Sequence, residues 1–251
     1  MQGIDLGSRK IKIVTMDGSM ISSRTSYDTI AFYRQYGRFQ DGRLHIDQES
    51  LGLADGPLTA TGYGKMTIPI AGARQIPEIQ AHVLGAVFQS GEQDFTLLDI
   101  GGQDTKVIQV REGRAVDFHT NDRCAAGSGR YLENMAAVLN ISLEELSAFS
   151  QEPVELNSTC AIFAETEIIA RILEGHSTDE LAAGVNYALY RRIAPLLKKL
   201  PSSLVLLAGG GAKSLALQAI IAREMQARVE ALPDPVFNGA IGCCSAEIET
   251  W

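Results

Sequence analysis

The sequence has no apolar run long enough to cross a membrane. Its best apolar run, residues 204–208, is far shorter than the ~20 residues that a membrane-spanning helix needs. The chain also opens without the basic segment and apolar stretch that together mark a secretory signal. We therefore expect a cytoplasmic protein with no membrane anchor.

Positive charge is scarce as well. The 251 residues include 22 Lys and Arg against 30 Asp and Glu, which gives a formal net charge of -8. This balance argues against a broad surface for nucleic acid, so anionic ligands must be held by local dipoles. With 45% hydrophobic and 21% charged residues, the composition is that of a folded globular protein.

Cysteine and histidine are few and lack the common metal-binding spacings. Neither a ferredoxin-type CxxCxxC run nor an HExxH pattern occurs. Without a secretory signal, the four cysteines are expected to be reduced thiols or metal ligands. The adjacent Cys243 and Cys244 point in different directions on an apolar helix, which favours core packing. The histidines expected to be structural or on the surface are His45, His82, His119 and His176.

A pattern of three strands occurs twice in the chain. Residues 3–6, 10–16 and 20–30 have the composition of strands and are separated by turns. Residues 95–100, 105–110 and 115–119 repeat the same order of strands and turns. We predict a duplicated α/β fold with a cleft between its halves. The first half spans residues 1–91 and the second spans residues 92–251.

Most of the remaining second half has helical patterns. Helices are expected at residues 127–139, 142–150, 160–174, 177–199, 215–227 and 238–248, with one strand at 203–207. Two of these helices begin with capping boxes, at Ser142 and Ser177. Residues 34–56 are polar and have no clear period.

Three glycine-rich turns each follow a predicted strand. They read GIDLGS at residues 3–8, DIGGQDTK at 99–106 and LAGGGAK at 207–213. Glycine lets the backbone approach a phosphate closely and present N–H groups to its oxygens. One such turn alone is usually a hairpin or a helix cap, whereas a set of three favours a phosphate-binding protein.

Two aspartates occupy equivalent places in the two repeats. Asp5 and Asp99 each precede a glycine turn, so a fold with a cleft would bring both carboxylates near the bound phosphates. Hard oxygen ligands of this kind suit a hydrated Mg²⁺ ion. The alternative is that each aspartate only caps its own turn.

The three turns, in this order, resemble the phosphate-1, phosphate-2 and adenosine segments of the ASKHA ATPases. The resemblance extends over nearly the whole chain and implies the duplicated fold of actin, hexokinase and Hsp70, which is related to that of ribonuclease H. It also implies that ATP or ADP binds with Mg²⁺ between the halves. We expect Asp5 and Asp99 to organise the metal and Gln103 or Asp104 to orient the attacking water. The phosphates are expected beside Gly7, Ser8, Gly101 and Gly102, and the nucleoside beside Gly209, Gly210, Gly211 and Lys213.

Two cysteine-containing segments resemble a particular family of these ATPases. NDRCAAGSGRYLE at residues 121–133, STCAIFAETEI at 158–168 and PEIQAH at 77–82 are similar to the 2-hydroxyacyl-CoA dehydratase activators of the BcrAD/BadFG type. The resemblance implies a homodimer whose axis carries one [4Fe-4S] cluster, with Cys124 and Cys160 as ligands in each subunit. A cluster normally takes four thiolates, and two chains would supply four.

In such a protein, ATP hydrolysis drives low-potential electrons to a partner enzyme. The resemblance implies a 2-hydroxyacyl-CoA dehydratase, a benzoyl-CoA reductase-type enzyme or a double-cubane cluster protein as acceptor, and ferredoxin or flavodoxin as donor. Arg9 departs from the pattern, because many relatives have a hydroxyl residue there. Two alternatives are a kinase resembling N-acetylglucosamine kinase and an actin-like assembly protein. The cluster content separates both from the activator.

Overall fold

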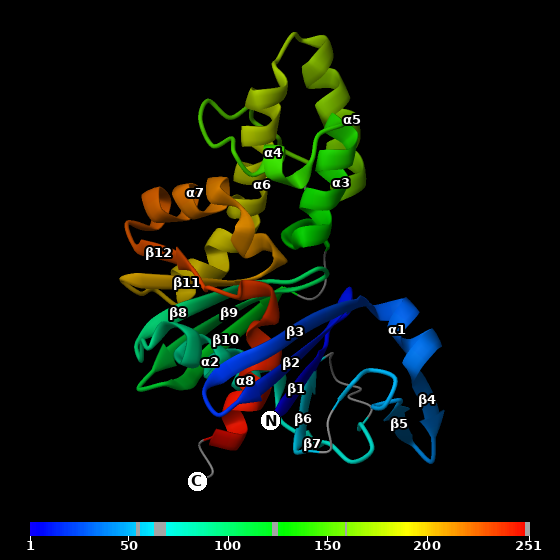
Figure 1. Ribbon diagram of the computed structural model, residues 1–251. Helices are drawn as coiled ribbons and strands as arrows, with labels where there is room; N and C mark the ends of the chain where they lie inside the picture. The colour runs from blue at the N-terminus through cyan, green and yellow to red at the C-terminus, as the bar shows by residue number, and fades with distance from the viewer. Residues whose placement is uncertain (54–55, 63–68, 122–124, 159, 249–251) are drawn as a thin grey trace. The chain divides into compact units, whose positions relative to one another are not determined.

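A computed structural model describes residues 1–53, 56–62, 69–121, 125–158 and 160–248 (Figure 1). Contacts group the chain into two compact units. The first comprises Met1–Gln93, Glu112–Ala115 and Val236–Trp251, and the second comprises Asp94–Arg111 and Val116–Pro235. Among the described residues, no helix is both long and apolar enough to cross a membrane.

A five-stranded sheet with the strand order β3-β2-β1-β6-β7 forms the first unit. Strand β1, which is buried along its whole length, pairs antiparallel with β2 and parallel with β6. In β2, Ile11 and Ile13 belong to one core cluster and Val14 and Met16 to another, so both faces of the strand contribute buried residues. The strands are β1 (Gln2–Leu6), β2 (Lys10–Asp17), β3 (Met20–Asp28), β6 (Leu58–Gly62) and β7 (Arg74–Gln75).

Residues 34–56, about which the sequence says least, include the end of a helix and a small hairpin. Helix α1 (Thr29–Tyr36) begins at Asp28, whose carboxylate accepts N–H bonds from the first turn. Strands β4 (Gly37–Gln40) and β5 (Arg43–Ile46) then pair through a two-residue turn. Asp41 and Gly42 both have positive φ, which suits such a turn.

Two helices of the first unit cross at glycine residues, which have no side chain to hold the helices apart. Helix α2 (Glu78–Ser90) packs against α8 (Asn238–Ile248). A Cβ atom at Gly242 would overlap the Ala81 carbonyl oxygen, and one at Gly85 would overlap the Asn238 carbonyl oxygen. The two backbones therefore approach closely only because both positions are glycine.

The second unit repeats the sheet topology of the first. Its strand order is β10-β9-β8-β11-β12, with β8 buried in the centre. As in the first sheet, the central strand pairs antiparallel with the strand that follows it and parallel with a strand farther along the chain. The strands are β8 (Phe95–Ile100), β9 (Thr105–Arg111), β10 (Arg114–Asn121), β11 (Leu204–Gly209) and β12 (Arg228–Ala231).

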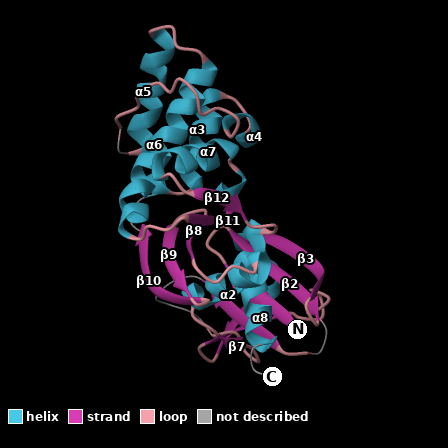
Figure 2. Ribbon diagram, turned by 90° about the vertical axis from the view of Figure 1, so that its left-hand side faces the viewer, coloured by secondary structure: helices cyan, strands magenta, loops and turns pink. Residues whose placement is uncertain are grey.

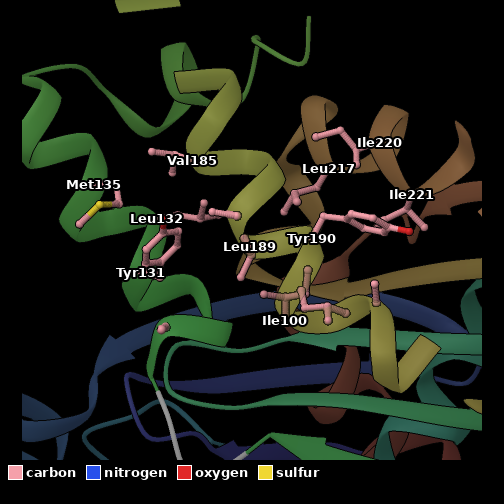
Figure 3. Close-up of a cluster of buried hydrophobic side chains, with 14 of the residues drawn as sticks. Ile100, Tyr131, Leu132, Met135, Val185, Leu189, Tyr190, Leu217, Ile220 and Ile221 are labelled. Atoms are coloured by element: carbon pink, nitrogen blue, oxygen red, sulfur yellow. The ribbon is translucent and has the colours of Figure 1, made fainter. Parts of the chain in front are cut away.

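Helices form a layer beside the second sheet, as Figures 1 and 2 show. The 3-10 turn η3 (Pro235–Phe237) lies in the sequence where the second unit ends and the first resumes. The α-helices of the second unit are α3 (Gly129–Leu139), α4 (Leu143–Leu146), α5 (Ala161–Leu173), α6 (Thr178–Lys199) and α7 (Leu215–Met225), and its 3-10 turns are η1 (Ala125–Gly127) and η2 (Gly210–Lys213). Their apolar faces meet in one core, in which Tyr131, Leu189 and Leu217 come from three different helices (Figure 3).

The predicted caps of α4 and α6 are present, but α4 is shorter than predicted. Both capping boxes form, at Ser142 with Glu145 and at Ser177 with Glu180. Instead of spanning residues 142–150, α4 ends after one turn, where Ser147 donates its hydroxyl hydrogen to the Glu144 carbonyl. Serine bonds of this kind compete with the helical backbone.

Candidate functional site

The first glycine turn places a lysine directly against the predicted metal-binding carboxylate. Asp5 in β1 is the register partner of Lys12 in β2, and Lys12 Nζ lies 3.0 Å from Asp5 Oδ2. A Cβ atom at Gly7 would lie 2.7 Å from the same Nζ, so a larger residue would displace the lysine. Thr29 donates its hydroxyl hydrogen to the Gly7 carbonyl at 2.8 Å and fixes the turn.

An equivalent pair occurs at the second glycine turn. Asp99 in β8 is the register partner of Lys106 in β9, and Lys106 Nζ lies 3.7 Å from Asp99 Oδ2. The same amine donates to Asp104 Oδ2 at 2.5 Å. The side chains of Asp99 and Lys106 are each only 4% exposed, so the lysine neutralises a buried carboxylate.

Sequence reasoning missed both lysines. Each lies seven residues after its aspartate, in the antiparallel strand that follows the turn. A strand, a glycine turn and a return strand place these two positions side by side, so the repeated spacing was a usable signal. Each lysine offsets the charge of its aspartate.

The third glycine turn lies at the same sheet edge as the second. Strand β11 runs parallel to β8, and Ala208 is the register partner of Asp99. Gly209 has φ +77°, and a Cβ atom there would lie 2.6 Å from Asp99 Oδ1. The structure therefore brings the predicted nucleoside turn against the predicted metal ligand. Gly210 and Lys213, both in η2, are exposed. Ser214 follows η2 and caps the N-terminus of α7.

The remaining predicted residues of the turns differ in their surroundings. Ser8, Gly101 and Gly102 are partly exposed. Gln103 is exposed, whereas Asp104 is held by Lys106. Which of the two would orient water therefore stays a prediction.

Residues at the start of α3 hold the second glycine turn in place. The Gly129 N–H donates to the Gly101 carbonyl at 2.9 Å, and the Arg130 N–H donates to the Gly102 carbonyl at 3.2 Å. Ser128, which is fully buried, adds a hydroxyl bond to the Gly102 carbonyl at 3.1 Å. The turn and the helix start thus form one hydrogen-bonded body, a few residues after Cys124.

The three cysteines that the structure describes have two different settings. Cys124 lies outside the described residues. Cys160 is half-buried and immediately precedes α5. Cys243 and Cys244 are fully buried in α8, as predicted, and burial raises the pKa of the Cys243 thiol well above its ordinary value. In the part of the chain that the structure describes, no three His, Cys, Asp or Glu side chains form a metal-binding group.

Of the four histidines, His82 is the buried one. It accepts an N–H bond from Asn238 through its backbone carbonyl at 2.9 Å. This contact joins α2 to α8, in agreement with the structural role predicted for it.

Comparisons with known proteins cover nearly the whole chain. The sequence profile of the BadF/BadG/BcrA/BcrD ATPase family matches residues 2–244. The (R)-2-hydroxyglutaryl-CoA dehydratase activating ATPase of Acidaminococcus fermentans is 31% identical over 249 residues, which cover 96% of this chain and 94% of that protein.

Solved structures agree with this match. The activator of the 2-hydroxyisocaproyl-CoA dehydratase from Clostridium difficile, solved with bound ADPNP, superposes with a TM-score of 0.84 at 29% identity and covers 100% of this chain and 94% of its own. A ROK family glucokinase from Streptomyces griseus shares the fold, with a TM-score of 0.59 at 14% identity over 99% of this chain and 98% of its own. The predicted duplicated fold of the actin and hexokinase class is confirmed.

Proposed function

Because the chain belongs to the BadF/BadG/BcrA/BcrD ATPase family, we propose that it uses ATP hydrolysis to drive electrons into a partner enzyme. The observation that carries the proposal is the hydrogen-bonded body formed by the second glycine turn and the start of α3. It connects a predicted phosphate-binding turn to the segment that follows a predicted cluster ligand.

ATP or ADP would bind with Mg²⁺ at the glycine turns. Asp5 and Asp99 would hold the metal, and their two lysines would face the phosphate oxygens. Phosphoryl transfer requires positioning and charge stabilisation more than covalent chemistry, which fits turns built from backbone N–H groups and buried cations. Gln103 or Asp104 would orient the attacking water. The phosphate turns use Gly7, Ser8, Gly101 and Gly102, and the nucleoside turn uses Gly209, Gly210, Gly211 and Lys213.

The cysteines fit a shared [4Fe-4S] cluster. Cys160 offers a partly exposed thiol at a helix N-terminus, whereas the thiols of Cys243 and Cys244 are buried in the core. Cys124 and Cys160 of two chains would supply the four thiolates of a homodimer. When bound, the cluster would supply a single low-potential electron at a time.

The partners follow from the same proposal. The acceptor would be a 2-hydroxyacyl-CoA dehydratase, a benzoyl-CoA reductase-type enzyme or a double-cubane cluster protein. Two dehydratase activators and a benzoyl-CoA reductase subunit among the relatives support the first two. Ferredoxin or flavodoxin would donate the electron. The reaction would take place in the cytoplasm.

The proposal is tested by the iron content of cysteine variants purified without oxygen. Cys124→Ser and Cys160→Ser should each remove the cluster from both subunits of the dimer, because every dimer loses two ligands. ATP binding should survive, since the glycine turns do not contain these residues. The matched control, Cys243→Ala with Cys244→Ala, should keep its full iron content. Unchanged iron in Cys160→Ser with normal electron delivery would contradict the proposal and favour a kinase.

A further inference from the structure

The segment that leads into Cys160 is held from two sides. Arg191 and Arg192 of α6 donate from Nη2 to the carbonyl oxygens of Leu156 and Ser158, each at 2.6 Å. Glu167 of α5 accepts the N–H groups of Asn157 and Ser158, both at 2.8 Å. Burial opposes ionisation of Glu167, but these N–H bonds hold its pKa below the usual range. At neutral pH the charged groups therefore fix residues 156–158 to α5 and α6.

Arg192 also contacts α3. Among the described residues, Arg191 shows no such contact. The guanidinium carbon of Arg192 lies 4.6 Å from the centroid of the fully buried Tyr131 ring. Its Nη1 donates to the Ala188 carbonyl of its own helix at 2.7 Å. One planar guanidinium thus joins α3, α6 and the segment before Cys160.

Tyr131 is tied in turn to the second glycine turn. It lies two residues after Gly129, whose N–H donates to the Gly101 carbonyl. On the strand side, Thr105 donates its hydroxyl hydrogen to the Gly127 carbonyl at 2.6 Å, and Thr105 is fully buried. Because α3 is a hydrogen-bonded helix, a shift of the turn carries the Tyr131 ring with it.

We propose that Arg192 is a positioning residue that transmits a shift of the second glycine turn, through Tyr131, to the segment before Cys160. The inference rests on the proposed function for one premise, namely that nucleotide binds at this turn. It adds a named route between the nucleotide and one cysteine. Arg191 provides the matched control, because it binds the same segment without contacting the Tyr131 ring.

Hydrogen–deuterium exchange of the full-length protein, with and without Mg²⁺ and ADPNP, tests this route. In the wild type, nucleotide should change deuterium uptake in peptides covering residues 125–135 and in peptides covering residues 156–168. In Arg192→Met the change should persist at 125–135 and disappear at 156–168. In Arg191→Met both changes should persist, since the contact with α3 remains. A retained change at 156–168 in Arg192→Met, or an equal loss in Arg191→Met, would overturn the inference.

A second pair of variants tests the same route with Arg192 in place, so that a folding defect caused by replacing Arg192 does not affect the result. Tyr131→Phe retains the aromatic face and should behave as wild type, whereas Tyr131→Leu removes that face and should lose the change at residues 156–168. Equal behaviour of the two variants would overturn the inference. Calorimetric titration with Mg²⁺ and ADPNP separates the two proposals. If nucleotide does not bind, the proposed function fails together with the inference; if it binds while Arg192→Met keeps the full response, only the inference fails.

Discussion

Each of the two buried aspartates forms an ion pair with a lysine that the sequence analysis did not predict. The pairs Asp5 with Lys12 and Asp99 with Lys106 occupy the same register position in the two sheets. Each lysine lowers the cost of burying a carboxylate and places positive charge beside a glycine turn. The two sites therefore combine a glycine turn, a buried carboxylate and an internal counter-charge.

Asp99→Asn should reduce Mg²⁺-dependent ATP hydrolysis roughly 100-fold, the scale expected when one preorganised electrostatic group is lost from an active site. The amide keeps the shape of the side chain and Lys106 keeps its ion pair with Asp104, so the loss of stability should be smaller than that caused by removing the lysine. The control is Asp117→Asn, because Asp117 is exposed in β10 and bonds only locally to the Phe118 N–H. Steady-state phosphate release measures both variants. Wild-type turnover in Asp99→Asn would exclude Asp99 from the mechanism.

Lys106→Met should lower the free energy of unfolding by about 3 kcal/mol, because removing one partner leaves a buried carboxylate without its counter-charge. Asp104 is 31% exposed, so solvent screens part of the loss there. Mg²⁺ should raise the melting temperature of this variant more than that of the wild type, since a divalent cation can replace the amine.

The matched control for this charge exchange is Lys213→Met. Lys213 is exposed, so its loss should leave both the melting temperature and its response to Mg²⁺ unchanged. Thermal unfolding with and without Mg²⁺ compares the three proteins. An identical Mg²⁺ response in Lys106→Met and the wild type would contradict the charge exchange.

For single residues, the sequence predicted the features that depend on their neighbours along the chain. The three glycine turns could be located from the residues alone, because each follows a run of strand-forming residues. The ligand role of Asp99 stays a prediction. The lysines were not predicted because their pairing with the aspartates depends on strand register. Register is not visible as a local sequence pattern. Cys243 and Cys244 were interpreted correctly because their neighbours in the helix are apolar.

Among the elements, the crossing of α2 and α8 depends most on individual residues. A Cβ atom at Gly242 would overlap the Ala81 carbonyl oxygen and lie 2.8 Å from the Gly85 backbone nitrogen. The predicted helix at residues 238–248 agrees with α8. Its packing partner could not be predicted, because the contact joins positions more than 150 residues apart and leaves no local pattern.

Gly242→Ala should therefore cost about 3 kcal/mol, the upper part of the usual range for overpacking a core. Backbone atoms are in the way, so the two helices must separate. Denaturant unfolding measures the loss. Gly210→Ala is the control for stability, because no described atom lies within 4 Å of its added methyl group. Equal stability of the two variants would contradict the close crossing.

For the whole molecule, the duplication gives two sheets of the same strand order, each with a glycine turn and an Asp–Lys pair. The sequence predicted this duplication because both repeats keep the order of strand, glycine turn and strand. The division at residue 92 stays a prediction. So does the role of Cys124, which lies outside the described residues.

Protein purified without oxygen should be a dimer carrying about four irons per two chains, because one chain offers only two cysteines in the matching motifs. Exposure to air should bleach the cluster and weaken the dimer. ATP binding should persist in the resulting monomer. Sedimentation analysis with parallel iron determination follows both changes. A monomer with a complete cluster would contradict the shared site.

The return of α8 to the first unit also affects the order in which the protein matures on the ribosome. Gly3 lies against Cys243 and Cys244, and the small core around Val14 and Met16 is completed by Ala240 and Ile241. The N-terminal unit, although it is made first, cannot close until residues 238–248 have emerged from the ribosome. Until α8 packs against it, the nascent N-terminal sheet leaves the apolar surface around Val14 and Met16 exposed to solvent.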